Sequence, residues 1–211
     1  MKKTKSNKFA VWLITTGALL MISALLLLCF NEKENAEAGK SAEKTLLSLH
    51  ELIEIKPTEE AIHTETPALP SESATPEMQT VMIDGEAYIG MISIPSLELT
   101  LPVMADWDYA KLKKSPCRQT GSVYTDDLVI AAHNYKRHFG RLKDLEAGAE
   151  LSFTDVNGEV FRYKAVKVET VSPESVEEVL LSAYPLVLYT CTYGGKTRVA
   201  AFFEKMGEII M

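Results

Sequence analysis

Cysteine is scarce in this chain of 211 residues, which contains only Cys29, Cys117 and Cys191. Three separated thiols are too few for a disulfide framework, and no Cys-x-x-Cys or His-x-x-x-His spacing indicates a zinc site. Basic clusters are missing outside the first eight residues, and the net charge is −7. Both facts argue against a nucleic-acid-binding protein, because counterion release requires clustered Lys and Arg. The sequence therefore predicts no metal ion, no other cofactor and no nucleic-acid partner.

The charge that is present differs from one part of the chain to the next. Residues 1–8 carry four Lys and no acidic residue, whereas residues 31–80 carry four basic side chains against eleven acidic ones. The whole chain is 46% apolar, which is typical of a globular protein. We therefore expect unlike segments: a basic cytoplasmic tail (1–8), an apolar segment (9–30), an acidic segment (31–80) and a globular domain (81–211).

Residues 9–30 form a run of 22 residues without a charged side chain. As a helix, this run is about 33 Å long, enough to cross a hydrocarbon core of about 30 Å. Lys residues precede it and Glu residues follow it, so the positive-inside rule places the N-terminus in the cytoplasm and the rest outside the cell membrane. A cleaved signal peptide is the alternative, but the apolar part of such peptides is usually only about 7–15 residues long. The favoured prediction is an uncleaved, single-pass transmembrane helix.

The acidic segment 31–80 is predicted to be an extracellular stalk. Within it, residues 41–55 carry leucines at helical spacing, so a short amphipathic helix fits there. Residues 56–80 are instead rich in Pro, Glu, Thr, Ser and Ala and contain few large apolar residues. Too little surface can be buried to offset the entropy of ordering, so we expect semi-extended, flexible chain.

Most of residues 81–211 is predicted to form short β-strands. Asn157-Gly158 between two alternating runs is a strong hairpin signal, and Pro102 marks its strand as an edge or bulged strand. Helical turns are expected at residues 109–114, at 141–145 and from 172 onward. The predicted strands cover residues 88–95, 97–104, 128–133, 150–154, 159–171, 186–192 and 198–203. This pattern indicates a mainly β domain, either a closed barrel or a sandwich.

Three residues stand at the ends of predicted strands, where a rigid scaffold can hold reactive side chains. His133 and Cys191 each end an apolar run, and Arg198 begins the strand that follows Cys191. A Cys with a His elsewhere in the chain is a candidate nucleophile and proton carrier, and an Arg can hold an oxyanion. Each residue also has an ordinary explanation, as a packed Cys, a hydrogen-bonded loop His or a surface Arg paired with a carboxylate. Spacing alone leaves both interpretations open.

The sequence around these residues resembles the sortases, the transpeptidases of Gram-positive cell surfaces. LVLYTCTYGGKTR at 186–198 is similar to the family's strand that ends in Thr-Cys and is followed by an Arg, and AAHN at 131–134 is similar to the strand that ends in His. The chain departs from the family pattern at Leu188 and Tyr189, which replace a first Thr-x pair, and at Ala132, where Gly is usual. The resemblance covers about residues 88–204.

This resemblance implies a closed, sortase-type eight-stranded β-barrel with short helices, preceded by the transmembrane helix. It also implies that Cys191 attacks an LPxTG-like sorting signal on secreted proteins, that Arg198 holds the oxyanion and that His133 moves the proton. An amine acceptor such as a peptidoglycan precursor then receives the protein. Thr190 and Tyr193, which flank the cysteine, are expected to contact the substrate.

Several alternatives stay open within this interpretation. The lack of an Asp-Pro-aromatic lid motif and of a C-terminal anchor favours a housekeeping, class B-like or class D-like sortase over a pilin-linking one, with class B-like or class D-like as the prediction. A mainly hydrolytic cysteine peptidase and a tethered binding module with an inert Cys191 are the other rivals. His138 is the second histidine of the domain, and Cys117 is interpreted as a packed apolar group. Some sortases bind calcium, but the carboxylates at 126–127, 174 and 177–178 are interpreted as a solvated surface.

Overall fold

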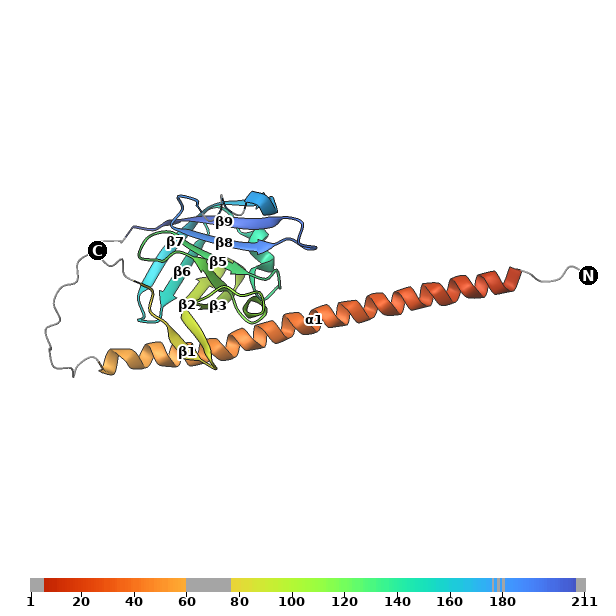
Figure 1. The fold of residues 1–211 in the computed structure, drawn as a ribbon, viewed down its shortest axis with the longest axis horizontal. Coiled ribbons are helices and arrows are strands. Elements are labelled where there is room, and N and C mark those ends of the chain that lie inside the picture. The colour runs from red at the N-terminus through yellow and green to blue at the C-terminus, as the bar shows by residue number, and fades with distance from the viewer. Residues whose placement is uncertain (1–5, 60–76, 176, 178, 180, 208–211) are drawn as a thin grey trace, which may run out of the picture. The chain divides into compact units, whose positions relative to one another are not determined.

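The computed structural model describes residues 6–59, 77–175, 177, 179 and 181–207 (Figure 1). The chain divides into two compact units, Met1–Glu37 and Ala38–Met211, and each is described by itself. Helix α1 (Ser6–Glu59) begins in the first unit and ends in the second. All residues of the candidate site belong to the second unit.

In the first unit, α1 carries the apolar run that the sequence predicts to cross a membrane. Its large apolar side chains, between Phe9 and Phe30, are exposed rather than packed on protein. Within the described residues, one helix is long and apolar enough to span a membrane. Such a helix is compatible with a membrane anchor or with a signal sequence.

The helix does not stop after the apolar run, and this differs from the predicted separate helix at 41–55. Residues 31–55 are rich in Glu, Lys, Ala and Leu, which favour helix, and the first proline of the chain is Pro57. One continuous helix therefore extends to Glu59. The predicted stalk is thus helical at its start, while residues 60–76 lie outside the described part of the chain.

In the second unit, one face of α1 is buried. Ala38, Ala42, Thr45 and Leu49 are buried, and their spacing of three or four residues places them on one side of the helix. Leu49 belongs to the same buried cluster as Tyr88. This part of the predicted stalk is therefore packed on the β domain, whose compact unit begins at Ala38 rather than at residue 81.

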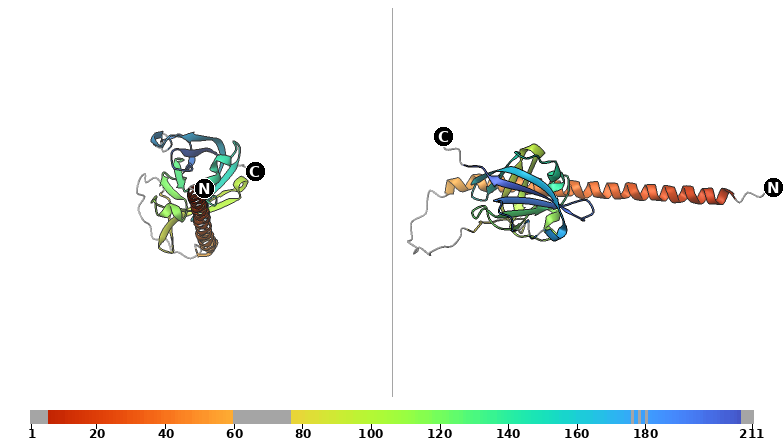
Figure 2. Two further views of the ribbon diagram at one scale, coloured as in Figure 1. Left: turned by 90° about the vertical axis from the view of Figure 1, so that its right-hand side faces the viewer. Right: turned by 90° about the horizontal axis from the view of Figure 1, so that it is seen from above.

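The second unit is built around a closed β-barrel (Figures 1 and 2). The strands among the described residues are β1 (Val81–Ile83), β2 (Glu86–Ile94), β3 (Leu99–Met104), β4 (Cys117–Thr120), β5 (Leu128–Ala132), β6 (Glu150–Asp155), β7 (Val160–Val171), β8 (Leu186–Cys191) and β9 (Arg198–Lys205). Their order in the sheet is β1-β2-β3-β4-β5-β8-β9-β7-β6, and a further pairing of β2 with β6 closes it. β1 is an extra strand at the side of β2, so β2 to β9 form the predicted eight-stranded barrel, which is confirmed.

All seven predicted strands are present, with ends that differ by one or two residues. Asn157-Gly158 lies in the turn between β6 and β7, which pair as the predicted antiparallel hairpin. Pro102 lies in β3, which pairs with β2 along its length but meets β4 at Met104. Strands β1 and β4 were not predicted, because both are short and β4 (CRQT) is largely polar.

Short 3-10 helices occupy several of the connections. They are η1 (Pro95–Leu97), η2 (Lys111–Lys113), η3 (Phe139–Asp144) and η4 (Pro173–Ser175). The last three lie where the sequence predicts helical turns. Phe139 and Leu142 of η3 are buried in the main core cluster, so the connection after β5 is anchored in the barrel.

Every residue of β5 is buried, which explains its continuous apolar run. Leu128, Ile130 and Ala132 belong to the main core cluster. Val129 and Ala131, which point to the opposite side of the strand, belong to two other buried clusters. A strand buried on both faces is a rigid support for the residue that follows it.

Candidate active site

The register of three strands brings the candidate residues to one end of the barrel. β5 and β8 are parallel neighbours in which Ala132 pairs with Thr190, so the next residues, His133 and Cys191, leave the two strands side by side. β8 and β9 are antiparallel, and Cys191 pairs directly with Arg198. Neighbouring strands lie about 4.8 Å apart. His133, Cys191 and Arg198 therefore stand on three adjacent strand ends.

A buried hydrogen bond joins two of these strand ends. Thr190 Oγ1 donates to the carbonyl oxygen of Ala132 at 2.8 Å, and the side chain of Thr190 is 3% exposed. Its hydroxyl is therefore occupied by a hydrogen bond within the protein. Tyr193, the other residue predicted to contact the substrate, is 93% exposed in the loop after β8. Of these two residues, Tyr193 has the side chain that an external molecule can reach.

Cys191 is half-buried and its thiol is free. The guanidinium of Arg198 lies against the β8–β9 loop, where Nη1 donates to the carbonyl oxygens of Gly195 at 3.0 Å and Thr197 at 3.1 Å. A guanidinium has five N–H groups, so the bonds of one nitrogen leave further donors for an oxyanion. The arrangement fits a nucleophile with a fixed positive charge beside it.

The β8–β9 loop turns tightly enough to set Arg198 opposite the cysteine. The Thr192 N–H donates to the Thr197 carbonyl at 2.9 Å, and the Thr197 N–H donates to Thr192 Oγ1 at 3.1 Å. Gly194 and Gly195 have φ angles of 80° and 71°, which glycine adopts without steric cost. The glycine pair therefore permits the reversal of the chain between the two strands.

The loop that carries His133 is held by its own backbone. The Phe139 N–H donates to the His133 carbonyl at 3.2 Å, and the Gly140 N–H donates to the Tyr135 carbonyl at 2.9 Å. A Cβ atom at Gly140 would lie 2.4 Å from the carbonyl oxygen of Asn134, so a larger residue does not fit there. The histidine thus leaves a rigid strand and enters a loop of fixed shape.

Two tyrosine rings contact the imidazole of His133. The ring centroid of Tyr109 lies 5.5 Å from that of His133, with 81° between the ring planes, and the centroid of Tyr135 lies 5.0 Å away at 39°. Tyr135 follows the histidine by two residues, whereas Tyr109 comes from the connection between β3 and η2. Neither tyrosine was predicted as a site residue. No pattern around position 109 indicates that it approaches residue 133.

The rival histidine and cysteine are both buried. Burial, and to a smaller extent the nearby His133, lower the pKa of His138 to about 4. Burial raises the pKa of the Cys117 thiol to about 11, and this side chain packs in an apolar cluster, as predicted. A buried, protonated thiol is unreactive. His133 and Cys191, by contrast, are half-buried.

No group of three acidic, His or Cys side chains lies together as a metal site within the described residues. Of the carboxylates considered for calcium, Asp126 pairs with Lys205 at 2.8 Å, and Asp127 accepts a hydrogen bond from the Ser122 N–H at 2.9 Å. Glu178 lies outside the described residues. These two aspartates therefore contribute to contacts within the fold.

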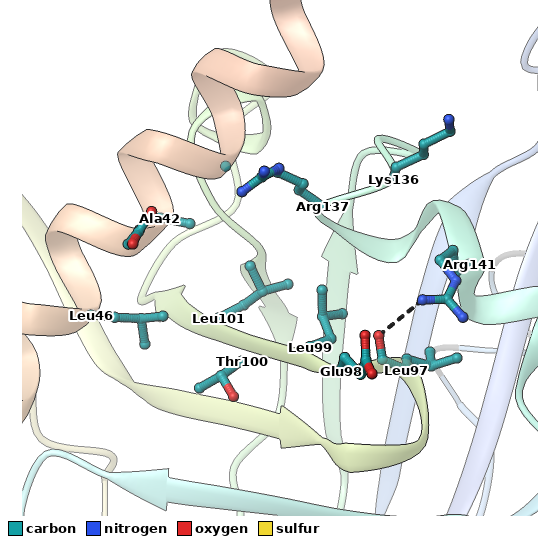
Figure 3. A pocket seen from close by; sticks show the side chains of 12 residues that line it. Ala42, Leu46, Leu97, Glu98, Leu99, Thr100, Leu101, Lys136, Arg137 and Arg141 are labelled. Carbon is teal, nitrogen blue, oxygen red and sulfur yellow. Dashed lines mark hydrogen bonds between the residues drawn. The ribbon is translucent and has the colours of Figure 1, made fainter. Parts of the chain in front are cut away.

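A pocket of about 370 Å³ lies between α1, the start of β3 and the loop after His133 (Figure 3). Leu46 of α1 and leucines of the β3 region line it, with Arg137 from the loop and Arg141 from η3. Arg141 Nη1 donates to the carbonyl oxygen of Leu97 at 3.2 Å, as the dashed line in Figure 3 marks. Neither Cys191 nor the histidine lines this pocket, so it is separate from the candidate active site.

Comparison with known proteins identifies the family of the β domain. Residues 92–205 match the sequence model of the sortase domain, and this match covers more than half of the chain. It includes His133, Cys191 and Arg198. The comparison with curated proteins gave no match.

Solved sortase structures share the fold. Sortase C1 from Streptococcus agalactiae has a TM-score of 0.52 at 23% identity, covering 60% of this chain and 72% of that one. Group B Streptococcus Pilus Island 1 sortase C2 has a TM-score of 0.51 at 24% identity, covering 60% and 77%. Sortase A from Corynebacterium diphtheriae has a TM-score of 0.50 at 24% identity, covering 58% and 62%. At these identities the likeness shows the fold alone, and these class A and class C enzymes do not support the predicted class B-like or class D-like assignment.

Proposed function

Because the chain belongs to the sortase family, a family of cysteine transpeptidases, we propose that it cleaves an LPxTG-like sorting signal and joins the cleaved protein to an amine. The observation that carries this proposal is the register of β5, β8 and β9, which aligns His133, Cys191 and Arg198 on adjacent strand ends. A nucleophile, a proton carrier and a fixed cation are the groups that acyl transfer requires.

In the first half-reaction, the Cys191 thiolate attacks the carbonyl carbon of the Thr in the sorting signal. The carbonyl oxygen becomes an oxyanion, to which N–H groups of Arg198 donate. When this tetrahedral intermediate collapses, the Thr–Gly bond breaks and His133 gives its proton to the departing amine. The products are a thioester on Cys191 and a released C-terminal peptide.

In the second half-reaction, the amine of an acceptor attacks the thioester carbonyl. His133 takes a proton from the attacking amine, and Cys191 leaves as the thiolate while a new amide bond forms. Water in place of the amine would give a free carboxylate by the same steps. The acceptor therefore decides between a transpeptidase and a mainly hydrolytic peptidase.

We further propose that residues 9–30 anchor the enzyme in the cell membrane, with its N-terminus in the cytoplasm and the barrel outside. Lysines before the run and glutamates after it support this orientation. A tethered enzyme meets exported proteins and a lipid-linked peptidoglycan precursor at high effective concentration. This location suits an acceptor amine in the cell wall.

A pilin lysine is the second candidate acceptor, because class C enzymes, one of them from a pilus island, share the fold. The absence of an Asp-Pro-aromatic motif from the sequence supports cell-wall anchoring by a class B-like or class D-like enzyme instead. The two candidates differ in the amine that resolves the thioester. A panel of acceptors therefore separates them.

The test uses the full chain in detergent micelles with LPxTG-like and NPxTN-like peptides, and with triglycine or a lysine-containing pilin peptide as acceptor. We expect the intact mass of the wild type to rise by the N-terminal half of the cleaved peptide, followed by ligation. The Cys191→Ala variant should form no adduct, whereas Cys117→Ala should react like the wild type. Ligation by Cys191→Ala would remove that residue from its role. No adduct with any peptide, together with slow alkylation of Cys191, would favour a binding module.

A further inference from the structure

The ring of Tyr109 makes a contact that core packing does not explain. Its side chain is 62% exposed and belongs to none of the buried hydrophobic clusters. Among the described residues, its ring contacts one other ring, that of His133, in a perpendicular arrangement with 5.5 Å between centroids. Perpendicular contacts at 4.5–7 Å are a favoured geometry of aromatic pairs. This exposed ring therefore contacts the imidazole and not the buried clusters of the core.

The backbone around Tyr109 is fixed, so the ring is presented in a defined place. Asp108 Oδ1 accepts hydrogen bonds from the N–H groups of Ala110 at 2.7 Å and Lys111 at 3.3 Å. The Leu112 N–H donates to the Asp108 carbonyl at 3.0 Å, and the side chain of Leu112 is buried. An aspartate that bonds to the N–H groups two and three residues later is a common way to fix a turn.

A second ring, from the loop that carries His133, limits the orientations open to the imidazole. Tyr135 contacts His133 at 5.0 Å and also contacts the buried His138 at 5.6 Å. Ionisable groups near His133 include Tyr109, Tyr135 and His138, and Cys191 and Arg198 stand on the adjacent strand ends. Tyr135 is tied to the core through His138, whereas Tyr109 is free of such packing and can be changed without loosening the barrel.

We propose that Tyr109 is a positioning residue whose ring fixes the orientation of the His133 imidazole at the strand end next to that of Cys191. This inference rests on the proposed function, in which the histidine carries the proton in both half-reactions. An aromatic ring packs against both the charged and the neutral imidazole, so the orientation is kept while the proton comes and goes.

The test compares Tyr109→Ala with Tyr109→Phe, which keeps the ring, and with Trp107→Ala as the matched control. Trp107 is 45% exposed in the same connection, and in the described part of the chain its ring contacts no other aromatic ring. In Tyr109→Ala we expect kcat for ligation to fall about tenfold with KM within twofold, a loss inside the range that misplaced groups cause. Tyr109→Phe and Trp107→Ala should stay within twofold of the wild type.

A second readout needs no sorting peptide and so does not depend on the proposed reaction. In the full chain labelled with ¹³C at histidine Cε1, loss of the Tyr109 ring current should move the His133 resonance, while the His138 resonance stays in place. Tyr109→Phe should leave both unchanged. If no ligation is found with any peptide but the resonance moves, the contact stands and the proposed function fails.

Three results would overturn the proposal. The first is a Tyr109→Ala variant with unchanged kcat and an unchanged His133 resonance. The second is a rise in KM with kcat intact, which would make the tyrosine a substrate contact. The third is an equal loss in Trp107→Ala, which would assign the effect to the loop as a whole.

Discussion

The hydroxyl of Thr190 donates a hydrogen bond of 2.8 Å to the carbonyl oxygen of Ala132, and this bond fastens the end of β8 to the end of β5. His133 and Cys191 are the next residues of the two strands. The distance between His133 and Cys191 therefore depends on Thr190, although the hydroxyl of this buried threonine bonds to neither residue. The residue before the cysteine has a structural role.

The Thr190→Val variant tests this role, because valine has nearly the same shape but no hydroxyl. We expect the free energy of unfolding to fall by about 1–2 kcal/mol, the cost of one lost buried hydrogen bond. Acyl-enzyme formation should slow several-fold, since the two strand ends are less firmly paired. Thr190→Ser keeps the hydroxyl and should lie closer to the wild type in both measurements. Denaturant titration and intact-mass kinetics, both in detergent micelles, provide the comparison.

The two cysteines of the barrel should differ strongly in alkylation. With its pKa raised to about 11 by burial, the Cys117 thiol is about one part in a thousand thiolate at pH 8, and it is closed to solvent. Iodoacetamide should therefore modify Cys191 in the folded chain and modify Cys117 after unfolding in guanidinium chloride. Peptide mapping by mass spectrometry measures both sites. Equal modification in the folded chain would contradict the burial of Cys117.

Stability should fall as the pH drops below about 6.5, in part because of His138. The pKa of this side chain is lowered to about 4 in the folded protein by burial first and by the nearby His133 second. The unfolded chain therefore binds more protons between pH 6.5 and pH 4, and protonation favours unfolding. The full effect below pH 4 is about 3 kcal/mol. His138→Phe, which cannot titrate, should show a smaller loss of stability over this interval, and an unchanged loss would count against a lowered pKa.

The packed part of α1 can be tested at a buried and an exposed leucine of the same helix. Leu49 is fully buried beside Tyr88, whereas Leu47 is exposed. Leu49→Ala should cost about 2–4 kcal/mol through lost burial and the cavity left behind, and Leu47→Ala should cost close to nothing. Limited proteolysis should cut the Leu49→Ala chain in the helix sooner than the wild type. Equal cleavage of the two variants would show that this face does not hold the helix.

Alternation and turn signals were enough to predict seven of the eight barrel strands. The run LVIAA predicts a strand buried on both faces, and β5 has that burial. The short polar strand β4 was missed because its place is fixed by pairing with β5, from Cys117 opposite Ala131 onward, and not by its own pattern. The length of α1 was missed because helix-forming residues were interpreted separately on either side of the apolar boundary.

The positions of the candidate residues were predictable where strands end, and not where loops meet. His133, Cys191 and Arg198 follow from the strand pattern together with the resemblance. The approach of Tyr109 to His133 depends on the turn that Asp108 fixes and on the path of the connection between β3 and η2. Contacts between residues this far apart in the chain produce no periodic pattern in the sequence. Thr190 was predicted beside the substrate, but its burial could only be known once β5 and β8 were paired.

Because β5 and β8 are distant in sequence, their parallel pairing brings the proposed reactive residues together only in the folded chain. Cys191 and Arg198 share a local hairpin, but the histidine strand joins them across 58 positions of sequence, as the Thr190–Ala132 bond shows. Such distant contacts form only when a chain closes a long loop. A chain threaded unfolded through a membrane would therefore carry its cysteine without a histidine next to it. Folding on the far side would complete the reactive pair, so that export and activation become successive steps.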